Sequence, residues 1–102
     1  MADIKNKLTP QEATEQIRYV LENGYFFVAG HCRKQMRSRN YTDPDIESLL
    51  LHGKIEEDPV FHKKRREWRY RVEGSIEGDE TVLVIAFPSN VKLTCITIFA
   101  LD

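Results

Sequence analysis

Residues 67–99 decide the fold, with the sequence EWRYRVEGSIEGDETVLVIAFPSNVKLTCITIF. Apolar and polar side chains alternate over 67–76, which is typical of a strand with one buried face. The run 81–87 is apolar at nearly every position, as in a central strand, and 92–101 is again rich in strand-forming residues. Glu-Gly-Asp and Pro-Ser-Asn turns separate these runs, so we expect three consecutive antiparallel strands.

The residues before these strands favour helices with well-marked starts. Thr-Pro-Gln-Glu at 9–12 and Thr-Asp-Pro-Asp at 42–45 each place a capping threonine beside a first-turn proline and a carboxylate. The elements expected here are helices over 10–23, 31–39 and 43–52, an apolar strand over 25–29, and a possible short strand over 54–58. The predicted fold class is α+β, with N-terminal helices packed on one face of a three- to four-stranded antiparallel sheet.

Length and composition are those of one globular domain. The chain has 102 residues, of which 41% are hydrophobic and 30% charged. We therefore expect a single domain over 1–102, with 1–8 as a flexible N-terminus. No apolar run is long enough for a membrane span or a signal peptide, and Cys32 and Cys95 lie in unlike contexts. These features predict a cytoplasmic protein whose two thiols belong to the core.

Charge is distributed in blocks along the chain. The formal net charge is −1, yet residues 31–40 and 62–71 carry ten of the fifteen Lys and Arg residues and a single acid, Glu67. The acids are concentrated in 41–58 and 72–102. Because an electrostatic field depends on local charge, a nearly neutral chain can still present a basic groove to nucleic acid. The alternative is that the blocks pair with one another on a solvated surface.

The expected strand over 67–76 orients one of these basic blocks. If Trp68 packs in the core, Arg69 and Arg71 lie on the opposite, open face, while Tyr70 is left undecided between core and rim. Guanidinium and ammonium groups in such a row suit a phosphate backbone. The predicted RNA- or phosphate-binding residues are Arg33, Arg37, Arg39, Lys63, Lys64, Arg65, Arg66 and Arg71.

Two histidines are candidates for proton transfer. His31 begins a basic helix, where the helix dipole and Arg33 favour a neutral imidazole, so it could act as a base or simply bond the backbone. His62 adjoins the Lys-Lys-Arg-Arg run and could be an acid, a base or an ordinary loop residue. We expect no metal or cofactor, because no Cys or His spacing matches a metal motif. The candidate catalytic residues are His31, His62, Arg69 and Tyr70.

Several short motifs are similar to a known family. The segment HCRKQMRSRNYTD at 31–43, followed by LLLHGKI at 49–55, resembles the start of the domain of unknown function DUF4258. That family typically shows a His-Ala start, an Arg-Met pair, an Arg-Gly-Ile-Ser turn and a helix ending in Leu-x-x-Gly-x-Ile. YRVEG at 70–74 and ITIF at 96–99 also look similar, and the resemblance covers roughly 14–100. This chain has Gln35 where the family usually has Arg.

The resemblance implies a relative of the RelE/ParE-like toxins of bacterial toxin–antitoxin pairs. It therefore implies a RelE/ParE-like fold, RNA or ribosome-bound mRNA as partner, and an antitoxin, which for many members is of zinc-finger and helix-turn-helix type. Cleavage in that class is metal-free, with attack by the ribose 2′-hydroxyl on the adjacent phosphate. The motif match singles out His31, Arg39 and Thr97. The alternative is a non-catalytic protein- or nucleic-acid-binding module of the same fold, including ParE-like gyrase inhibition.

Overall fold

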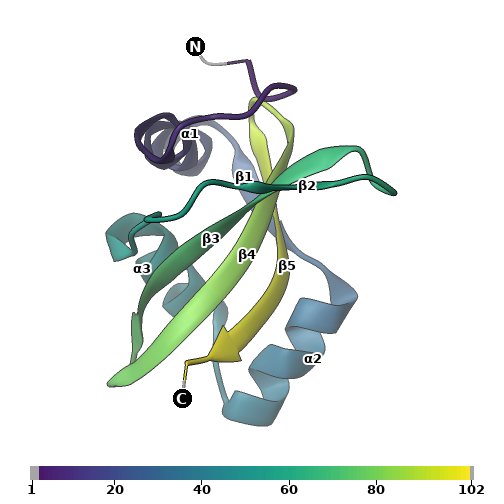
Figure 1. Cartoon of the computed structure of the whole chain (residues 1–102). Coiled ribbons are helices and arrows are strands. Elements are labelled where there is room, and N and C mark those ends of the chain that lie inside the picture. Colours follow the sequence, from purple (N-terminus) through teal and green to yellow (C-terminus); the bar gives the residue numbers. More distant parts are fainter. Residues whose placement is uncertain (1–2, 102) are drawn as a thin grey trace.

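The structure is a computed structural model that describes residues 3–101. This part of the chain is an α+β fold with three helices and a five-stranded mixed sheet (Figure 1). Predicted helices and the three long strands are confirmed, with boundaries shifted by at most two residues. The elements are α1 (Pro10–Asn23), β1 (Tyr25–Val28), α2 (Gly30–Arg39), α3 (Asp43–His52), β2 (Val60–His62), β3 (Glu67–Ile76), β4 (Asp79–Ser89) and β5 (Lys92–Ala100).

The sheet is larger than predicted and is not purely antiparallel. Its strand order is β1-β5-β4-β3-β2, and β1 runs parallel to β5 with Tyr25 opposite Lys92. The prediction of a three- to four-stranded antiparallel sheet is therefore wrong in number and direction. A Cβ on Gly24 would lie 1.8 Å from the Val91 carbonyl oxygen, so glycine permits the close approach that places β1. A short apolar strand fits several sheet edges, and its partner depends on such long-range contacts.

The strand predicted over 54–58 does not form. Lys54 makes one isolated bridge to Glu73, and the strand β2 begins only after Pro59. β2 pairs with Glu67–Arg69, whereas β4 pairs with β3 from Tyr70 onward. The β2–β3 hairpin thus continues past the end of the β3–β4 pairing, and Figure 1 shows it projecting from the sheet. We call residues 60–69 the basic arm.

One face of the sheet packs against helices α1 and α3 and forms the core. Tyr70 and Val72 of β3 are buried on this face. The alternation predicted this for Val72 and left Tyr70 undecided. Uninterrupted alternation along the predicted strand over 92–101 would place Leu93, Cys95, Thr97 and Phe99 on one face, but this expectation is wrong. Val84 lies opposite Thr97 but Ile85 lies opposite Cys95, so Ile96 is an extra residue on β5. This bulge reverses the alternation, and Leu93, Cys95 and Ile98 are the buried residues of the strand.

Helix α2 closes the edge of β5 that β1 does not reach. β1 pairs with β5 only as far as Cys95, and α2 packs against β5 beyond that point. The Gln35 side-chain oxygen accepts hydrogen bonds from the Ile98 backbone N–H and the Thr97 hydroxyl, each at 2.8 Å. Gln35 therefore takes the place that a neighbouring strand would take at this position.

The segment before α1 is tied to the core at its last residue. Leu8 is buried, and its N–H donates to the Tyr70 hydroxyl at 2.9 Å. Leu8 is thus part of the packed fold and not of a flexible N-terminus, while residues 1 and 2 of that prediction lie outside the described residues. None of the helices in residues 3–101 is long and apolar enough to cross a membrane.

Candidate functional site

The tip of the basic arm concentrates positive charge. Lys63, Lys64, Arg65 and Arg66 follow one another in the turn between β2 and β3, and all four are exposed. The Arg65 backbone N–H donates to Nδ1 of His62 at 3.1 Å, and Arg66 adopts a left-handed φ of 53°. Among residues 3–101, none of the four cations forms an ion pair. The turn geometry therefore presents four unneutralised charges to solvent.

The arginines of the β3 strand are differently placed. Arg69 and Arg71 lie on the sheet face opposite the helices, as predicted, but each has an acidic partner. Arg69 Nε lies 3.0 Å from Glu67, and Arg71 Nε lies 3.4 Å from Glu57. The Arg71 guanidinium also lies over the Phe99 ring, 5.8 Å from its centroid. Arg69 is thus hydrogen-bonded to its carboxylate, whereas Arg71 Nε makes only the longer ion-pair contact and, among residues 3–101, no hydrogen bond. A phosphate would compete with a carboxylate for each of them.

The second basic segment is a separate surface. Arg33 of α2 pairs with Asp43, while Lys34, Arg37 and Arg39 are exposed. α2 packs along β5, whereas the arm extends from β3 near the other edge of the sheet (Figure 1). No hydrogen bond or ion pair joins the two segments in the part of the chain that the structure describes. The two basic blocks thus do not line one continuous groove.

The predicted catalytic residues are not gathered in one place. His31 is exposed at the start of α2, and His62 lies at the base of the arm tip. Tyr70, which the sequence left undecided, belongs to the core, where it is 1% exposed. Burial raises the pKa of the Tyr70 hydroxyl, although its bond from Leu8 opposes this. Of the four candidates, only His62 lies at the arm tip beside the cations that have no acidic partner.

A hollow of about 700 Å³ lies at the base of the basic arm. We call it the arm hollow. Sequence reasoning predicted Arg65, Arg66 and Tyr70 as site residues but assigned Trp68 to the core and missed Phe61. The available signal was that Phe61 and Trp68 bracket the basic run, so that a hairpin would set them side by side. The lining residues are Ile4, Lys5, Phe61, Arg65, Arg66, Glu67, Trp68, Tyr70, Phe87 and Pro88.

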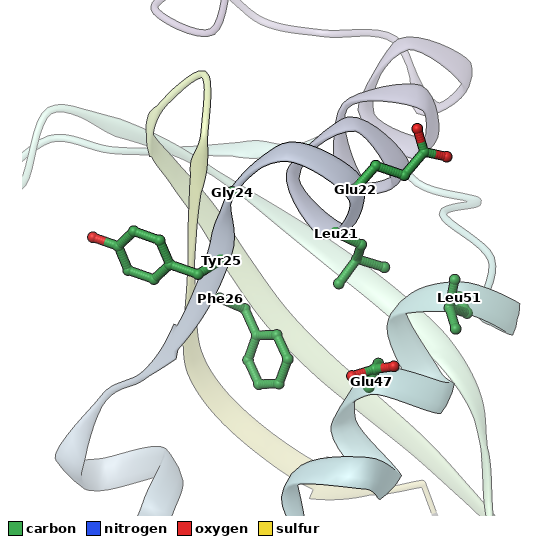
Figure 2. A pocket seen from close by; sticks show the side chains of 7 residues that line it. All are labelled: Leu21, Glu22, Gly24, Tyr25, Phe26, Glu47 and Leu51. Atoms are coloured by element: carbon green, nitrogen blue, oxygen red, sulfur yellow. The ribbon is translucent and has the colours of Figure 1, made fainter.

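A second hollow, of about 410 Å³, lies near the opposite edge of the sheet between α1, β1 and α3. Figure 2 shows Leu21, Phe26 and Leu51 around it, with the Glu22 and Glu47 carboxylates at its margin. We call it the acidic hollow. None of the predicted site residues lines it.

The two cysteines are core thiols, as predicted. Both are fully buried and free. Desolvation raises the pKa of the Cys32 thiol to about 11, with nearby Arg33 opposing it, and desolvation raises that of Cys95 as well. Both groups are therefore protonated and poorly nucleophilic at neutral pH. Within residues 3–101 no three His, Cys, Asp or Glu side chains are grouped so that they could hold a metal ion.

Fold and site together define an α+β domain with a mixed sheet and a projecting basic hairpin. The domain family described as "Domain of unknown function (DUF4258)" matches residues 28–100, and the chain belongs to this family. The predicted family is thus confirmed, and the match includes the whole basic arm. No curated protein and no solved structure matches the chain.

Proposed function

We propose that the protein binds single-stranded RNA through the basic arm. The observation that carries this proposal is the contrast within one hairpin: the four cations at the tip have no acidic partner among the described residues, whereas Arg69 and Arg71 each have one. A hairpin tip that projects from the sheet can reach a phosphate backbone without a clash from the rest of the domain. Unpaired Lys and Arg side chains supply the counterion-release term that dominates such binding.

The proposal is tested by fluorescence anisotropy with a labelled single-stranded RNA between about 50 and 200 mM salt. The variant replaces Lys63, Lys64 and Arg65 by Ala. We expect the affinity to fall by at least tenfold and the salt slope to decrease by about 2, because a single strand contributes about 0.7 per phosphate contact.

The matched control removes the same charge from α2 by replacing Lys34, Arg37 and Arg39 with Ala. These cations lie apart from the arm, so the control is expected to bind within about twofold of the unmodified protein, with a similar salt slope. Equal losses in the two variants would mean that net charge alone drives binding, and would contradict the proposed role of the arm. RNA binding that neither variant weakens would contradict it as well.

RNA cleavage by a toxin of the RelE/ParE-like class is the narrower candidate function, and the position of His62 favours it. Its Nδ1 accepts the Arg65 N–H, so Nε2 carries the proton when the ring is neutral. That proton could pass to the leaving 5′-oxygen as the ribose 2′-hydroxyl attacks the phosphate. A base for the 2′-hydroxyl is still required, and His31 lies on α2, away from the arm.

Incubation of purified protein with RNA or translating ribosomes tests cleavage. His62→Asn keeps a side-chain acceptor near the Arg65 N–H but removes the proton donor, so it should abolish cleavage and leave RNA binding intact. Binding without cleavage in the unmodified protein would favour the non-catalytic module. An antitoxin partner stays a prediction, which is tested by growth arrest on expression with and without the neighbouring gene. ParE-like gyrase inhibition also stays a prediction, and supercoiling assays test it.

A further inference from the structure

We infer that the arm hollow binds a nucleobase of the RNA strand, stacked against Trp68 and Phe61, with the attached phosphate on Arg65 and Arg66. This inference rests on the proposed function and names the part of the ligand that the hollow receives. The basic arm would then bind RNA in two places: its tip binds the phosphate backbone, and the arm hollow binds one base.

The walls of the hollow are aromatic. The Phe61 and Trp68 rings lie 5.0 Å apart between centroids, at an interplanar angle of 64°. Phe61 is 41% exposed, and Trp68 packs against the core but is only partly buried, so both rings keep accessible surface. Phe87 and the buried Tyr70, whose rings are 5.6 Å apart, lie deeper. A planar base can stack on one of the two outer rings while its edge meets the other.

The rim of the hollow is positively charged. Lys5, Arg65 and Arg66 are exposed there and form no ion pair with another of residues 3–101. The single acid of the lining, Glu67, is already bound to Arg69 at 3.0 Å. The net field at the entrance therefore favours an anion, although the walls favour an apolar plane.

A nucleotide combines both requirements in one molecule. Its base offers a flat apolar face, and its phosphate offers oxygen atoms to a bidentate guanidinium. An apolar peptide would leave three cations unmatched, and a free phosphate would leave the aromatic walls exposed. The volume of about 700 Å³ lies within the range of small-molecule sites.

The chain carries its own reporter, because Trp68 is its only tryptophan. We expect adenosine 5′-monophosphate and a short oligoadenylate to quench Trp68 fluorescence saturably, whereas ribose 5-phosphate, which lacks a base, does not. Phe61→Ala should weaken quenching by oligoadenylate about tenfold through loss of a stacking wall. Arg66→Gly should also weaken quenching by oligoadenylate. This substitution preserves the fold, because glycine tolerates the left-handed φ that Arg66 adopts.

The matched control is Phe27→Ala. Phe27 is also about half-exposed on an edge strand, but it lies on β1 and does not line the hollow, so its removal should leave quenching unchanged. Saturable quenching that Phe61→Ala leaves unchanged would overturn the inference. The inference would also be overturned if anisotropy shows that oligoadenylate binds but Trp68 fluorescence is not quenched. The RNA-binding function would then stand without the base site. An oligonucleotide that fails to bind at all would overturn both. If quenching depends on protein concentration and not on nucleotide concentration, the occupant of the arm hollow is a second copy of the chain, and the inference is overturned.

Discussion

The two edges of the sheet are built in opposite ways. At the β1 edge, Gly24 sits against the Val91 carbonyl and α2 continues along β5, so β1 and α2 together cover the outer edge of β5, although Tyr25 and Phe27 of β1 are themselves 57% and 51% exposed. At the β2 edge, a three-residue strand pairs only with the part of β3 that lies beyond the β3–β4 pairing. Val60 and Phe61 are 71% and 41% exposed there. Side chains are exposed at both edges, so the difference lies in the backbone: β1 is fixed by a close backbone contact, whereas β2 belongs to a projecting hairpin.

The hollows near the two edges differ in charge as well as in position. The acidic hollow has Glu22 and Glu47 among its lining, and the arm hollow has Lys5, Arg65 and Arg66. Both have apolar walls, so the hydrophobic effect alone would not distinguish their ligands. The charge at the rim decides which molecule each can attract. The net charge of −1 therefore conceals local surfaces of opposite sign.

The largest effect is expected where the β1 edge is tightest. Gly24→Ala would place a Cβ 1.8 Å from a backbone oxygen, which cannot move without shifting the β4–β5 turn. We expect the free energy of unfolding to fall by at least about 3 kcal/mol, the upper end for overpacking. Urea denaturation measures it. Gly30→Ala is the control, because no atom lies within 4 Å of its added Cβ, and it should be neutral or slightly stabilising.

The next effect tests whether α2 closes the β5 edge. Gln35→Leu removes the acceptor for the Ile98 N–H and the Thr97 hydroxyl. We expect a loss of about 2 kcal/mol and faster hydrogen exchange at Ile98, because a partly buried donor is left without its partner. Gln35→Glu keeps an acceptor oxygen and should lose less. Equal losses in both variants would show that packing, and not the hydrogen bonds, is what Gln35 provides.

A smaller effect separates tip cations from strand cations within the arm. Replacing Lys63 and Lys64 by Gln should weaken RNA binding about tenfold and leave the urea midpoint unchanged. Replacing Arg69 and Arg71 by Gln removes the same charge but breaks two ion pairs. It should change RNA binding less than threefold and cost up to about 1 kcal/mol of stability. A reversed ranking in the anisotropy assay would contradict the assignment of RNA contact to the tip.

The smallest effect is a pH dependence that arises from the buried thiols of α2 and β5. An unfolded thiol ionises near the ordinary value of 9.0, whereas burial raises the pKa of folded Cys32 to about 11. The folded state therefore keeps a proton that the unfolded state loses. This contribution is complete below pH 9 and declines as pH rises toward 11. Urea midpoints at pH 8 and 10 should differ less in a Cys32→Ala, Cys95→Ala variant than in the unmodified protein. The same variant should bind RNA with unchanged affinity if the arm is the binding site.

Local signals in the sequence predicted most of the fold. Helix starts at Thr9 and Thr42 were correct because capping boxes are encoded within four residues, and both boxes form. The alternation in β3 placed Arg69 and Arg71 correctly for the same reason. The strand over 25–29 was predicted, but its parallel pairing and the β5 bulge were missed because both depend on partners distant in sequence: the parallel neighbour of Tyr25 is Lys92, and Ile96 is extra only relative to β4.

The site was predicted only in part. Charge clustering found the tip cations, since it needs only the order of residues along the chain. It did not reveal the ion pair of Arg71, because the partner, Glu57, comes from a distant loop. Trp68 packs against the core, as predicted, but it is only partly buried and also lines the arm hollow. The core assignment did not indicate this hollow, because it depends on the pairing of β2 with β3, which brings Phe61 opposite Trp68.

The parallel pairing of β1 with β5 also orders events during synthesis. Tyr25 leaves the ribosome early, but its partner Lys92 belongs to the last strand to emerge. Until β5 is complete, β1 and the apolar side of α2 have no sheet to join, so the domain cannot finish folding from its N-terminal part alone. The β2–β3 hairpin needs only neighbouring residues and can form while the chain is still growing. A nascent chain can thus sample the contacts of its basic arm, which an isolated hairpin holds only marginally, before the rest of the domain has closed.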